Sequence, residues 1–332
     1  MSTATVPVLR EQLLDRREKL ETAIIGIDEN AELLRLLNEV DAALGRMDVG
    51  SYGLCDVCLD PIESDRLLAD PLVRLCLDHL TFEQQRALEE DLELAASIQR
   101  GLLPEPNLRV DGWEACFHYQ AAGPVSGDYC DLIKAEDGSL YFIFGDVSGK
   151  GVAASLLMAH LHAMFRTLVS VGMPLKTMME RASRVFCEST LPTQFATLVC
   201  GRADGNGEVE ICNAGHLPPL VVRNGVVTRI ESGGLPVGVF CDETFVAINL
   251  RLESGNTLFL YTDGLSETLN DGDIEYGRDR LAKLISETSG QDPQAMVEAC
   301  VDDLSRYRGG TPILDDVTMM AIRWNASEEH FA

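Results

Sequence analysis

The stretch Phe144-Gly-Asp-Val-Ser-Gly-Lys-Gly151 decides the fold of the second half of this 332-residue chain. It puts an aspartate where an apolar strand pattern, Leu140–Phe144, meets a glycine-rich turn, and a helical pattern, Val152–Val169, follows. A phosphate-binding P-loop is excluded, because that loop has four residues between its first glycine and Gly-Lys and a serine or threonine after the lysine. Here three residues separate those glycines, and a glycine follows Lys150. The pattern instead predicts a carboxylate that points into a cleft at a strand end.

Three more segments carry an aspartate beside glycine or another acid at the end of an apolar run. They are Ser126-Gly-Asp128, Tyr261-Thr-Asp263-Gly264 and Asp315-Asp316-Val-Thr318. For any single Asp-Gly pair, a plain turn is the favoured interpretation. Several carboxylates on neighbouring strands repel one another unless cations hold them, and hard oxygen ligands of this number suit Mg²⁺ or Mn²⁺. The four sets together therefore predict a divalent-metal site.

Strand and helix patterns alternate through this half of the chain. The further segments are strands over Phe195–Cys200, Val209–Cys212, Thr257–Thr262 and Thr318–Trp324, a helix over Pro174–Glu188, and a hairpin over Val221–Val227. The hairpin has Asn-Gly at its centre, which favours a type I′ turn.

Seven segments between about Glu89 and Trp324 carry a resemblance to a known family. They are Leu94-Ala-Ala-Ser-Ile-Gln99 with Leu102-Leu-Pro104, Val125-Ser-Gly-Asp-Tyr-Cys-Asp131, Gly145-Asp-Val-Ser-Gly-Lys-Gly151, Asn213-Ala-Gly-His216 with Pro218-Pro219, Leu235-Pro-Val-Gly238, Tyr261-Thr-Asp-Gly-Leu-Ser-Glu267 and Asp315-Asp-Val-Thr318. In this order they resemble the SpoIIE/RsbU-type protein phosphatases, within the metal-dependent PPM (type 2C) serine/threonine phosphatase clan. Ser126 and Cys130 depart from the family pattern, which usually has glycine and an aromatic residue there, and neither departure removes a carboxylate.

The resemblance implies an α+β fold, a PPM-type αββα sandwich over residues 107–326, with two Mn²⁺ or Mg²⁺ ions at one end of two central sheets. The residues it implies as ligands are Asp128, Asp146, Val147 through its carbonyl, Asp263, and Asp315 or Asp316.

The implied roles of these ligands differ. Asp146 would bridge both metals, and Asp263 and Asp315 would complete the second. Asp128 would lie nearer the first metal and is, with Asp146, the expected catalytic carboxylate. Asp316 competes with Asp315, and the Asp-x-x-Thr alignment favours Asp315 without deciding between them.

Two divalent ions can activate a shared water that attacks phosphorus in line, so no phosphoenzyme is needed. This agrees with the sequence, which has no Ser-His-Asp signature and no nucleophile elbow. The leaving alkoxide needs a proton, and the histidines of this domain are the candidates: His118, His160, His162 and His216. The sequence does not rank them, although a structural role is favoured for His216.

The amino-terminal half carries a second motif, Cys55-x2-Cys58 followed after 17 residues by Cys76-x2-His79. Two knuckles of soft ligands at this spacing predict one closed, structural zinc site. With Gly50-Ser-Tyr-Gly-Leu54 before the motif, and Pro61-Ile62 and Arg66-Leu67 within it, the segment resembles the DksA/TraR zinc finger. That family usually has a fourth cysteine at the place of His79.

The amino-terminal organisation follows from heptads and helix breakers. We predict a helical hairpin over 1–49, the zinc finger over 50–80, a linker helix over 81–106, and a short tail, 327–332. A heptad seam marks the second helix of the hairpin: Leu33, Leu37, Val40, Leu44 and Met47. A plain dimerising coil is a nearly equal alternative for 1–49.

The linker helix is expected to begin at a capping box, Thr81-Phe-Glu-Gln84, and to carry an apolar stripe. The stripe comprises Leu88, Leu92, Ala95, Ile98 and Leu102. It favours a homodimer through this helix, and a spacer packed on its own domain is the alternative.

The formal net charge is −26, and the chain has 27 basic and 53 acidic residues. Such a chain is a poor binder of nucleic acid or anionic membrane. Segment 50–80 holds six acidic residues against Arg66 and Arg74, so we interpret it as a regulatory or protein-binding module. Members of the DksA/TraR family bind RNA polymerase through an acidic coiled-coil tip, and here only Asp28 and Glu29 lie near the predicted turn.

The resemblance to the phosphatases implies a phosphorylated STAS-domain protein, an anti-sigma antagonist, as substrate. Two other classes stay open: a catalytically silent PPM domain that acts by contact, and a transcription factor that contacts RNA polymerase. We expect a cytoplasmic protein. The start lacks a signal-peptide pattern, no apolar run approaches about 18 residues, and the ten cysteines lack the spacing of a disulfide framework.

Overall fold

The computed structural model describes residues 5–24, 31–231 and 233–326. It divides into two compact units, Met1–Asp91 and Leu92–Ala332. The boundary lies inside helix α4 (Phe82–Leu102). The predicted tail and the acidic residues Asp28 and Glu29 lie outside the described residues.

The first unit is built on two antiparallel helices, α1 (Thr5–Ile24) and α2 (Ala31–Asp48). Their direction follows from two ion pairs, because Arg10 lies 2.8 Å from Asp48 while Arg17 lies 3.0 Å from Asp41. The rest of the unit comprises α3 (Ser64–Ala69) and the short 3₁₀ helix η1 (Leu77–His79). One apolar cluster joins these parts: Leu9, Leu13, Val40, Ala43, Leu44, Tyr52, Ile62 and Leu67 are buried together with Cys55 and Cys76.

Helix α4 begins at the predicted capping box. Gln84 N donates to the Thr81 hydroxyl at 3.2 Å, and Thr81 N donates to the Gln84 side chain at 3.0 Å. Its buried side chains are Ala96 and Gln99, whereas Ile98 is 60% exposed. Within one chain, Ala96 and Gln99 are therefore the residues of α4 that pack inward, while the stripe predicted for contact with a second copy keeps Leu88 and Ile98 exposed and stays a prediction.

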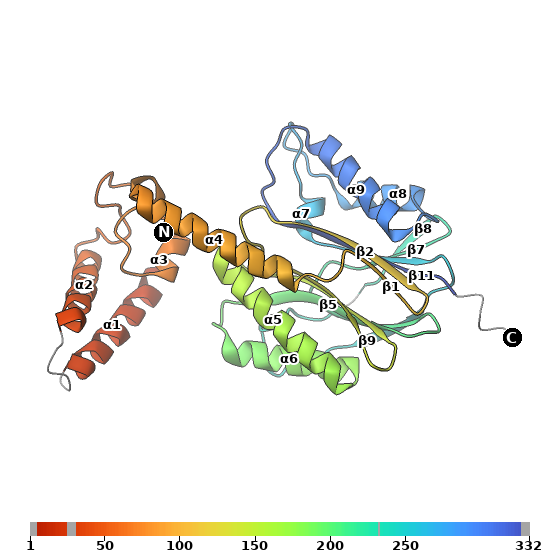
Figure 1. The fold of residues 1–332 in the computed structure, drawn as a ribbon, viewed down its shortest axis with the longest axis horizontal. Helices are drawn as coiled ribbons and strands as arrows, with labels where there is room; N and C mark the ends of the chain where they lie inside the picture. The colour runs from red at the N-terminus through yellow and green to blue at the C-terminus, as the bar shows by residue number, and fades with distance from the viewer. Residues whose placement is uncertain (1–4, 25–30, 232, 327–332) are drawn as a thin grey trace. The chain divides into compact units, whose positions relative to one another are not determined.

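The second unit is a sandwich of two antiparallel sheets (Figure 1). The six-stranded sheet has the order β1 (Asn107–Val110), β2 (Trp113–Gln120), β11 (Val317–Trp324), β10 (Thr257–Tyr261), β7 (Leu220–Arg223) and β8 (Val226–Arg229). The five-stranded sheet has the order β3 (Asp128–Lys134), β4 (Leu140–Val147), β5 (Ala196–Ala203), β6 (Glu208–Ala214) and β9 (Ala247–Arg251).

Helices cover the outer face of each sheet, so the layers run α, β, β, α. Helices α5 (Gly151–Val171) and α6 (Leu175–Ser189) share a core with the five-stranded sheet. Helices α8 (Arg278–Glu287) and α9 (Pro293–Arg308) share a second core with the six-stranded sheet. A third core, which includes Trp113, Phe142 and Phe144, fills the space between the sheets. The predicted αββα sandwich is confirmed.

Three details refine the predictions. The type I′ turn is present, since Asn224 and Gly225 have φ angles of 48° and 79°. One pair of the scattered cysteines, Cys187 and Cys241, forms a disulfide, which the spacing did not indicate. Helix α5 is long and apolar enough to span a membrane, contrary to our expectation, but its buried face packs on β3 and β4 as in a core helix.

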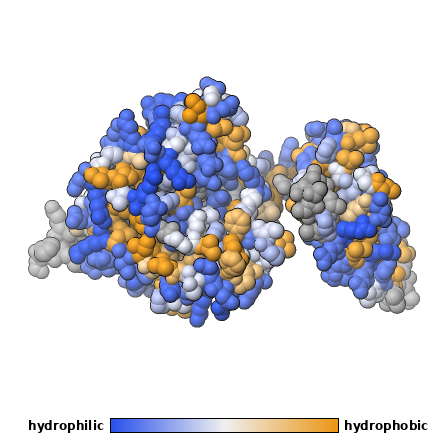
Figure 2. Space-filling model, turned by 180° about the vertical axis from the view of Figure 1, so that it is seen from behind, coloured by the Kyte–Doolittle hydropathy of each residue, from blue (hydrophilic) through white to orange (hydrophobic). Residues whose placement is uncertain are grey.

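The surface is mainly polar, with a content of charged residues, 24%, that is ordinary for a globular protein. On the face drawn in Figure 2, hydrophilic side chains predominate and hydrophobic ones form separate patches.

Candidate active site and metal-binding clusters

Two aspartates face each other where β3 begins and β4 ends. Asp128 and Asp146 are direct partners in the antiparallel register. Asp128 is 1% exposed, and its Oδ2 accepts hydrogen bonds from the hydroxyls of Thr318 (2.5 Å) and Thr262 (3.1 Å). Because both threonines belong to the β10–β11 side of the molecule, this carboxylate joins one sheet to the other.

A narrow space opens beside Gly127. A Cβ atom added there would lie 3.0 Å from the Val147 carbonyl oxygen and 3.2 Å from Asp146 Oδ1. Those two oxygens thus border one small volume that any larger side chain at 127 would fill. Two hard oxygen donors beside such a volume fit a small divalent cation.

The remaining acids come from the ends of β10 and β11. Asp263 is the first residue of α7 (Asp263–Ser266). The following Gly264 packs so closely on the backbone of Asp315 and Asp316 that a Cβ would collide with the Asp316 carbonyl. This close approach brings Asp263 beside the other two acids.

Asp315 and Asp316 have different partners. Asp316 accepts two backbone hydrogen bonds, from Ala122 N at 2.8 Å and from Gly127 N at 2.9 Å. Asp315 keeps a half-exposed side chain, and its Oδ2 lies 3.1 Å from Lys150 Nζ. Asp316 therefore holds the loop before Asp128, while Asp315 faces solvent and the ammonium group of Lys150.

The charges of these acids act on one another. Burial, followed by the charges of Asp263, Asp315 and Asp316, raises the pKa of Asp146 to about 7. Burial and the charge of Asp146 raise the pKa of Asp128 well above its usual range. The acids are thus electrostatic neighbours. The carboxylate oxygens of these acids are not gathered as closely as the ligands of a bound metal ion. Among the described residues, the cysteine and histidine cluster is the group of three or more possible ligands whose atoms all lie within 4.8 Å of one another.

A cavity of about 300 Å³ lies next to this acidic region. Lys150, Glu267, Leu314 and Asp315 are among the residues that line it. Lys150 Nζ also donates to the Leu314 carbonyl at 3.0 Å, which keeps the ammonium group at the edge of the cavity. Sequence reasoning did not single out Lys150, although it stands in the Gly-Lys-Gly segment.

His216 is a structural histidine, as favoured from the sequence. Its Nδ1 lies 2.9 Å from the Thr197 hydroxyl and its Nε2 lies 3.2 Å from the Tyr261 carbonyl. A carbonyl can only accept, so Nε2 carries the proton and Nδ1 accepts from Thr197. Burial lowers the pKa of His216 to about 4. Burial and two engaged nitrogens thus favour the neutral form of this histidine and fit a structural role.

Gln99 and Asp131 also lay outside the predicted site. Gln99 of α4 makes two hydrogen bonds to the backbone of Ser126, two residues before Asp128. Asp131 is fully buried and forms a bidentate pair with Arg166 of α5. Both occur in the segments quoted above, but a pattern in the sequence does not tell which partner a polar residue will meet.

The predicted zinc ligands lie together in the first unit. The four ligand atoms of Cys55, Cys58, Cys76 and His79 are all within 4.8 Å of one another. In the first knuckle, Leu59 N donates to the Cys55 carbonyl at 3.0 Å, with a left-handed φ of 63° at Leu59. In the second knuckle, His79 N donates to the Cys76 carbonyl at 3.1 Å. Three sulfurs and one imidazole in this arrangement suit a tetrahedral zinc ion.

The chain is similar in sequence to a known family and to several known proteins. Residues 136–325 match the family model described as Stage II sporulation protein E (SpoIIE). The chain is 25% identical to the phosphoserine phosphatase RsbU of Bacillus subtilis over 72% of this chain and 71% of RsbU. It is 26% identical to protein IcfG of Synechocystis sp. over 71% of this chain, and it spans only 42% of the length of IcfG.

A solved structure shares the fold of the second unit. The SiaA-PP2C domain of Pseudomonas aeruginosa superposes with a TM-score of 0.64 at 20% identity, covering 73% of this chain and 98% of that domain.

Proposed function

The chain belongs to the SpoIIE family, its second unit is a PPM-type serine/threonine phosphatase domain, and we propose that the whole protein is a metal-dependent phosphatase of phosphoserine and phosphothreonine in proteins. One observation carries the proposal. The pKa of Asp146 is raised to about 7 by burial and by the charges of Asp263, Asp315 and Asp316. Acids crowded in this way favour a bound cation.

We assign the Mn²⁺ or Mg²⁺ ligands among these residues. Asp146 and the Val147 carbonyl border the small volume at Gly127, and Asp263 and Asp315 complete the set. Asp315 is the better candidate over Asp316: both oxygens of Asp316 hold the loop before Asp128, whereas Asp315 is half-exposed and contacts its own neighbour's backbone and the side chain of Lys150. Bound divalent ions would supply Lewis acidity, which activates a water and neutralises charge on the phosphoryl group.

The protein's own side chains would position the reaction. Asp128, held by two threonine hydroxyls, would fix the end of β3 against Asp146. Lys150 stands at the edge of the adjacent cavity, where its ammonium group can hold a phosphoryl oxygen. The neutral, fully bonded His216 leaves protonation of the leaving alkoxide to another group.

Hydrolysis of a small aryl phosphate tests this activity. We expect turnover that requires Mn²⁺ or Mg²⁺ and falls by at least about a thousandfold in Asp146→Ala. Asp137→Ala is the matched control, because Asp137 is a half-exposed acid paired with Arg202 at the other end of the same hairpin. A folded protein that stays silent with either metal, with and without residues 1–80, would favour a contact-acting domain instead.

The substrate that we propose is a phosphorylated STAS-domain protein, an anti-sigma antagonist in a partner-switching pathway. The support is the resemblance to RsbU-type phosphatases and the 25% sequence identity to RsbU of Bacillus subtilis. Release of phosphate from phosphorylated STAS proteins of the host would test it. If none of them is dephosphorylated while the aryl phosphate is, the substrate assignment is wrong and the activity stands.

The first unit is proposed to be a regulatory module that holds one structural zinc ion. It connects to the phosphatase domain through α4, whose Leu94 and Ile98 are each 60% exposed and one turn apart. We propose that these two side chains form a homodimer contact. Light scattering of the full chain and of Leu94→Gln/Ile98→Gln tests this, since a monomeric wild type would exclude it.

We also propose that the protein works in the cytosol, where zinc-binding thiolates stay reduced and where the Cys187–Cys241 bond would be opened as well. Nucleic acid and membranes are not proposed as partners, because the chain is strongly acidic. Fractionation of the host cell checks this location.

A further inference from the structure

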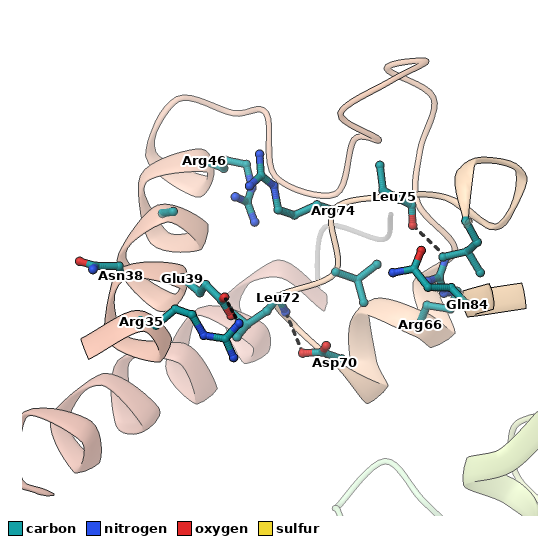
Figure 3. Close-up of a pocket in the computed structure, with 13 residues that line it drawn as sticks. Arg35, Asn38, Glu39, Arg46, Arg66, Asp70, Leu72, Arg74, Leu75 and Gln84 are labelled. Carbon is teal, nitrogen blue, oxygen red and sulfur yellow. Dashed lines mark hydrogen bonds and ion pairs between the residues drawn. The ribbon is translucent and has the colours of Figure 1, made fainter. Parts of the chain in front are cut away.

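The first unit contains a cavity of about 670 Å³, within the size range of small-molecule sites, which is about 300–1,000 Å³. Its lining comes from α2, from α3 and the segment that follows it, and from the start of α4 (Figure 3). Four arginines line it, Arg35, Arg46, Arg66 and Arg74, against two acids, Glu39 and Asp70. This balance is the opposite of the chain as a whole, which carries a net charge of −26.

The basic residues converge on the cavity from distant parts of the sequence. Segment 50–80 contains two lysine or arginine residues, Arg66 and Arg74, and both line it. The other two arginines come from α2. Both basic residues of the mainly acidic segment 50–80 therefore line the same cavity, together with two arginines of α2.

One of these arginines lacks a carboxylate partner. Arg74 pairs with Asp56 at 2.5 Å, and Arg66 pairs with Glu63 at 3.5 Å and donates to the Leu75 carbonyl at 2.8 Å. Arg46 forms no ion pair with any residue that the structure describes. Figure 3 draws its side chain next to that of Arg74.

The two guanidinium groups repel each other. Burial and the neighbouring charge of Arg74 lower the pKa of Arg46, and the carboxylate of Asp56, which pairs with Arg74, offsets part of this effect. An anion bound to Arg46 would offset the rest. Guanidinium groups match the oxygens of a phosphate, which they can bind with two parallel hydrogen bonds.

The rest of the lining is apolar and amide-bearing. Leu72, Val73, Leu75 and Leu80 line the cavity, together with the amide side chains of Asn38 and Gln84. Gln84 Oε1 already accepts from Thr81 N, so its NH₂ group remains to donate. An inorganic ion has no apolar part that could pack against these side chains.

We propose that this cavity binds a small organic phosphate, with its phosphoryl group on Arg46 and Arg74 and its apolar or heterocyclic part against Leu72, Val73 and Leu75. The site lies wholly within the first unit, so it does not depend on the phosphatase activity. Because Gln84 belongs to the first turn of α4, the ligand would contact the helix that continues into the phosphatase domain.

Calorimetric titration of the zinc-loaded full chain, without added Mn²⁺ or Mg²⁺, tests the proposal. The probes are AMP, adenosine and inorganic phosphate. We expect AMP to bind at one site per chain, and adenosine and phosphate to bind at least about tenfold more weakly. AMP affinity should fall about tenfold in Arg46→Gln, the loss of one charge-assisted contact.

The matched control is Arg86→Gln. Arg86 lies on α4, is 70% exposed, pairs with Glu90 and does not line the cavity. Its substitution should leave AMP affinity unchanged, and zinc content should be equal in all three proteins. The proposal is overturned by any of three results: no binding at millimolar AMP, equal affinity in Arg46→Gln, or adenosine binding as tightly as AMP.

Discussion

Gln99 of α4 makes a paired hydrogen bond with the backbone of Ser126. Its amide nitrogen donates to the Ser126 carbonyl at 2.7 Å, and its oxygen accepts from Ser126 N at 3.0 Å. Gln99 is 6% exposed, so both bonds are shielded from water. The same loop is held on its other side by Asp316, and it ends at Asp128. A movement of α4 at Gln99 would therefore shift Ser126, which precedes the buried carboxylate of Asp128 by two residues.

Replacing Gln99 by alanine should lower turnover more than it lowers stability. Gln99→Ala leaves two buried backbone groups of Ser126 unpaired, at a cost of about 1–3 kcal/mol each if water does not enter. We expect a drop in kcat of about tenfold or more, measured with the aryl phosphate, in protein that remains folded. Gln85→Ala, at an exposed position on the same helix, is the control and should behave as wild type. Equal kcat in the two variants would contradict a coupling through Gln99.

Asp146→Asn should make the protein without added Mn²⁺ or Mg²⁺ more stable while abolishing activity. The folded-state pKa of Asp146, about 7, lies above its ordinary value of 3.8, so ionisation at pH 8 opposes folding. Removing that charge should raise the free energy of unfolding by up to about 4 kcal/mol in zinc-loaded protein without added Mn²⁺ or Mg²⁺, from about 1.36 kcal/mol per pKa unit. Denaturant unfolding at pH 8 measures this. A less stable variant would show that crowding of the acids is not the dominant effect.

His216 predicts a loss of stability in acid. Its folded-state pKa is about 4 and its ordinary value is 6.5, so between these pH values the unfolded chain binds the proton more readily. The contribution is fully present above pH 6.5 and is lost as the pH falls towards 4, with a slope of at most about 1.4 kcal/mol per pH unit.

Unfolding curves of wild type and His216→Gln between pH 7 and pH 4.5 check this. The variant should be less stable at pH 7, because it loses the bond to Thr197 or to Tyr261, and should show a shallower pH dependence. Parallel curves for the two proteins would mean that His216 does not carry the proton uptake.

Removal of zinc should unfold the first unit and leave the second folded. Two of the four predicted ligands, Cys55 and Cys76, belong to the apolar cluster that joins the helices to the knuckles. Cys76→Ser should therefore release the metal, measured by mass spectrometry of the intact protein, and lose a separate melting transition. Asp78→Ala, an exposed change between two ligands, should keep the metal. Retention of one zinc per chain in Cys76→Ser would contradict the assignment.

Much of the second unit could be predicted from the sequence, because its longer apolar strands and turns carry strong local signals. The five predicted strands correspond to β4, β5, β6, β10 and β11, and the Asn224-Gly225 turn follows its dipeptide preference. Strand β3 was missed, since its two aspartates break the apolar pattern; Asp131 is buried only because Arg166 of α5 meets it. Edge strand β9 was missed because its residues are mostly half-exposed.

The candidate site divides in the same way. Glycine and aspartate at strand ends were visible locally, which is why Asp128, Asp146, Asp263 and the pair at 315–316 were all singled out. Their partners were not visible, because hydrogen bonds such as those of Asp316 with the 122–127 loop join residues nearly 200 positions apart. Lys150 was missed for that reason, since Leu314 lies 164 positions away. Gln99 was missed although Ser126 lies only 27 positions away, because no local pattern marks that pair. The sequence leaves Asp315 and Asp316 open, and their different contacts are the basis for proposing Asp315.

Asp128 Oδ2 accepts hydrogen bonds from two threonines on the side of the opposite sheet, so Asp128 is under selection for stability as well as for catalysis. A lineage that abandons phosphate hydrolysis can replace Asp146 and, by removing a buried charge, improve its fold. It cannot replace Asp128 as freely, because Thr262 and Thr318 would then lose their shared acceptor between the sheets. Descendants that have lost the chemistry should therefore keep Asp128 longest, so its presence alone is a poor sign of an active enzyme, and Asp146 is the residue to inspect.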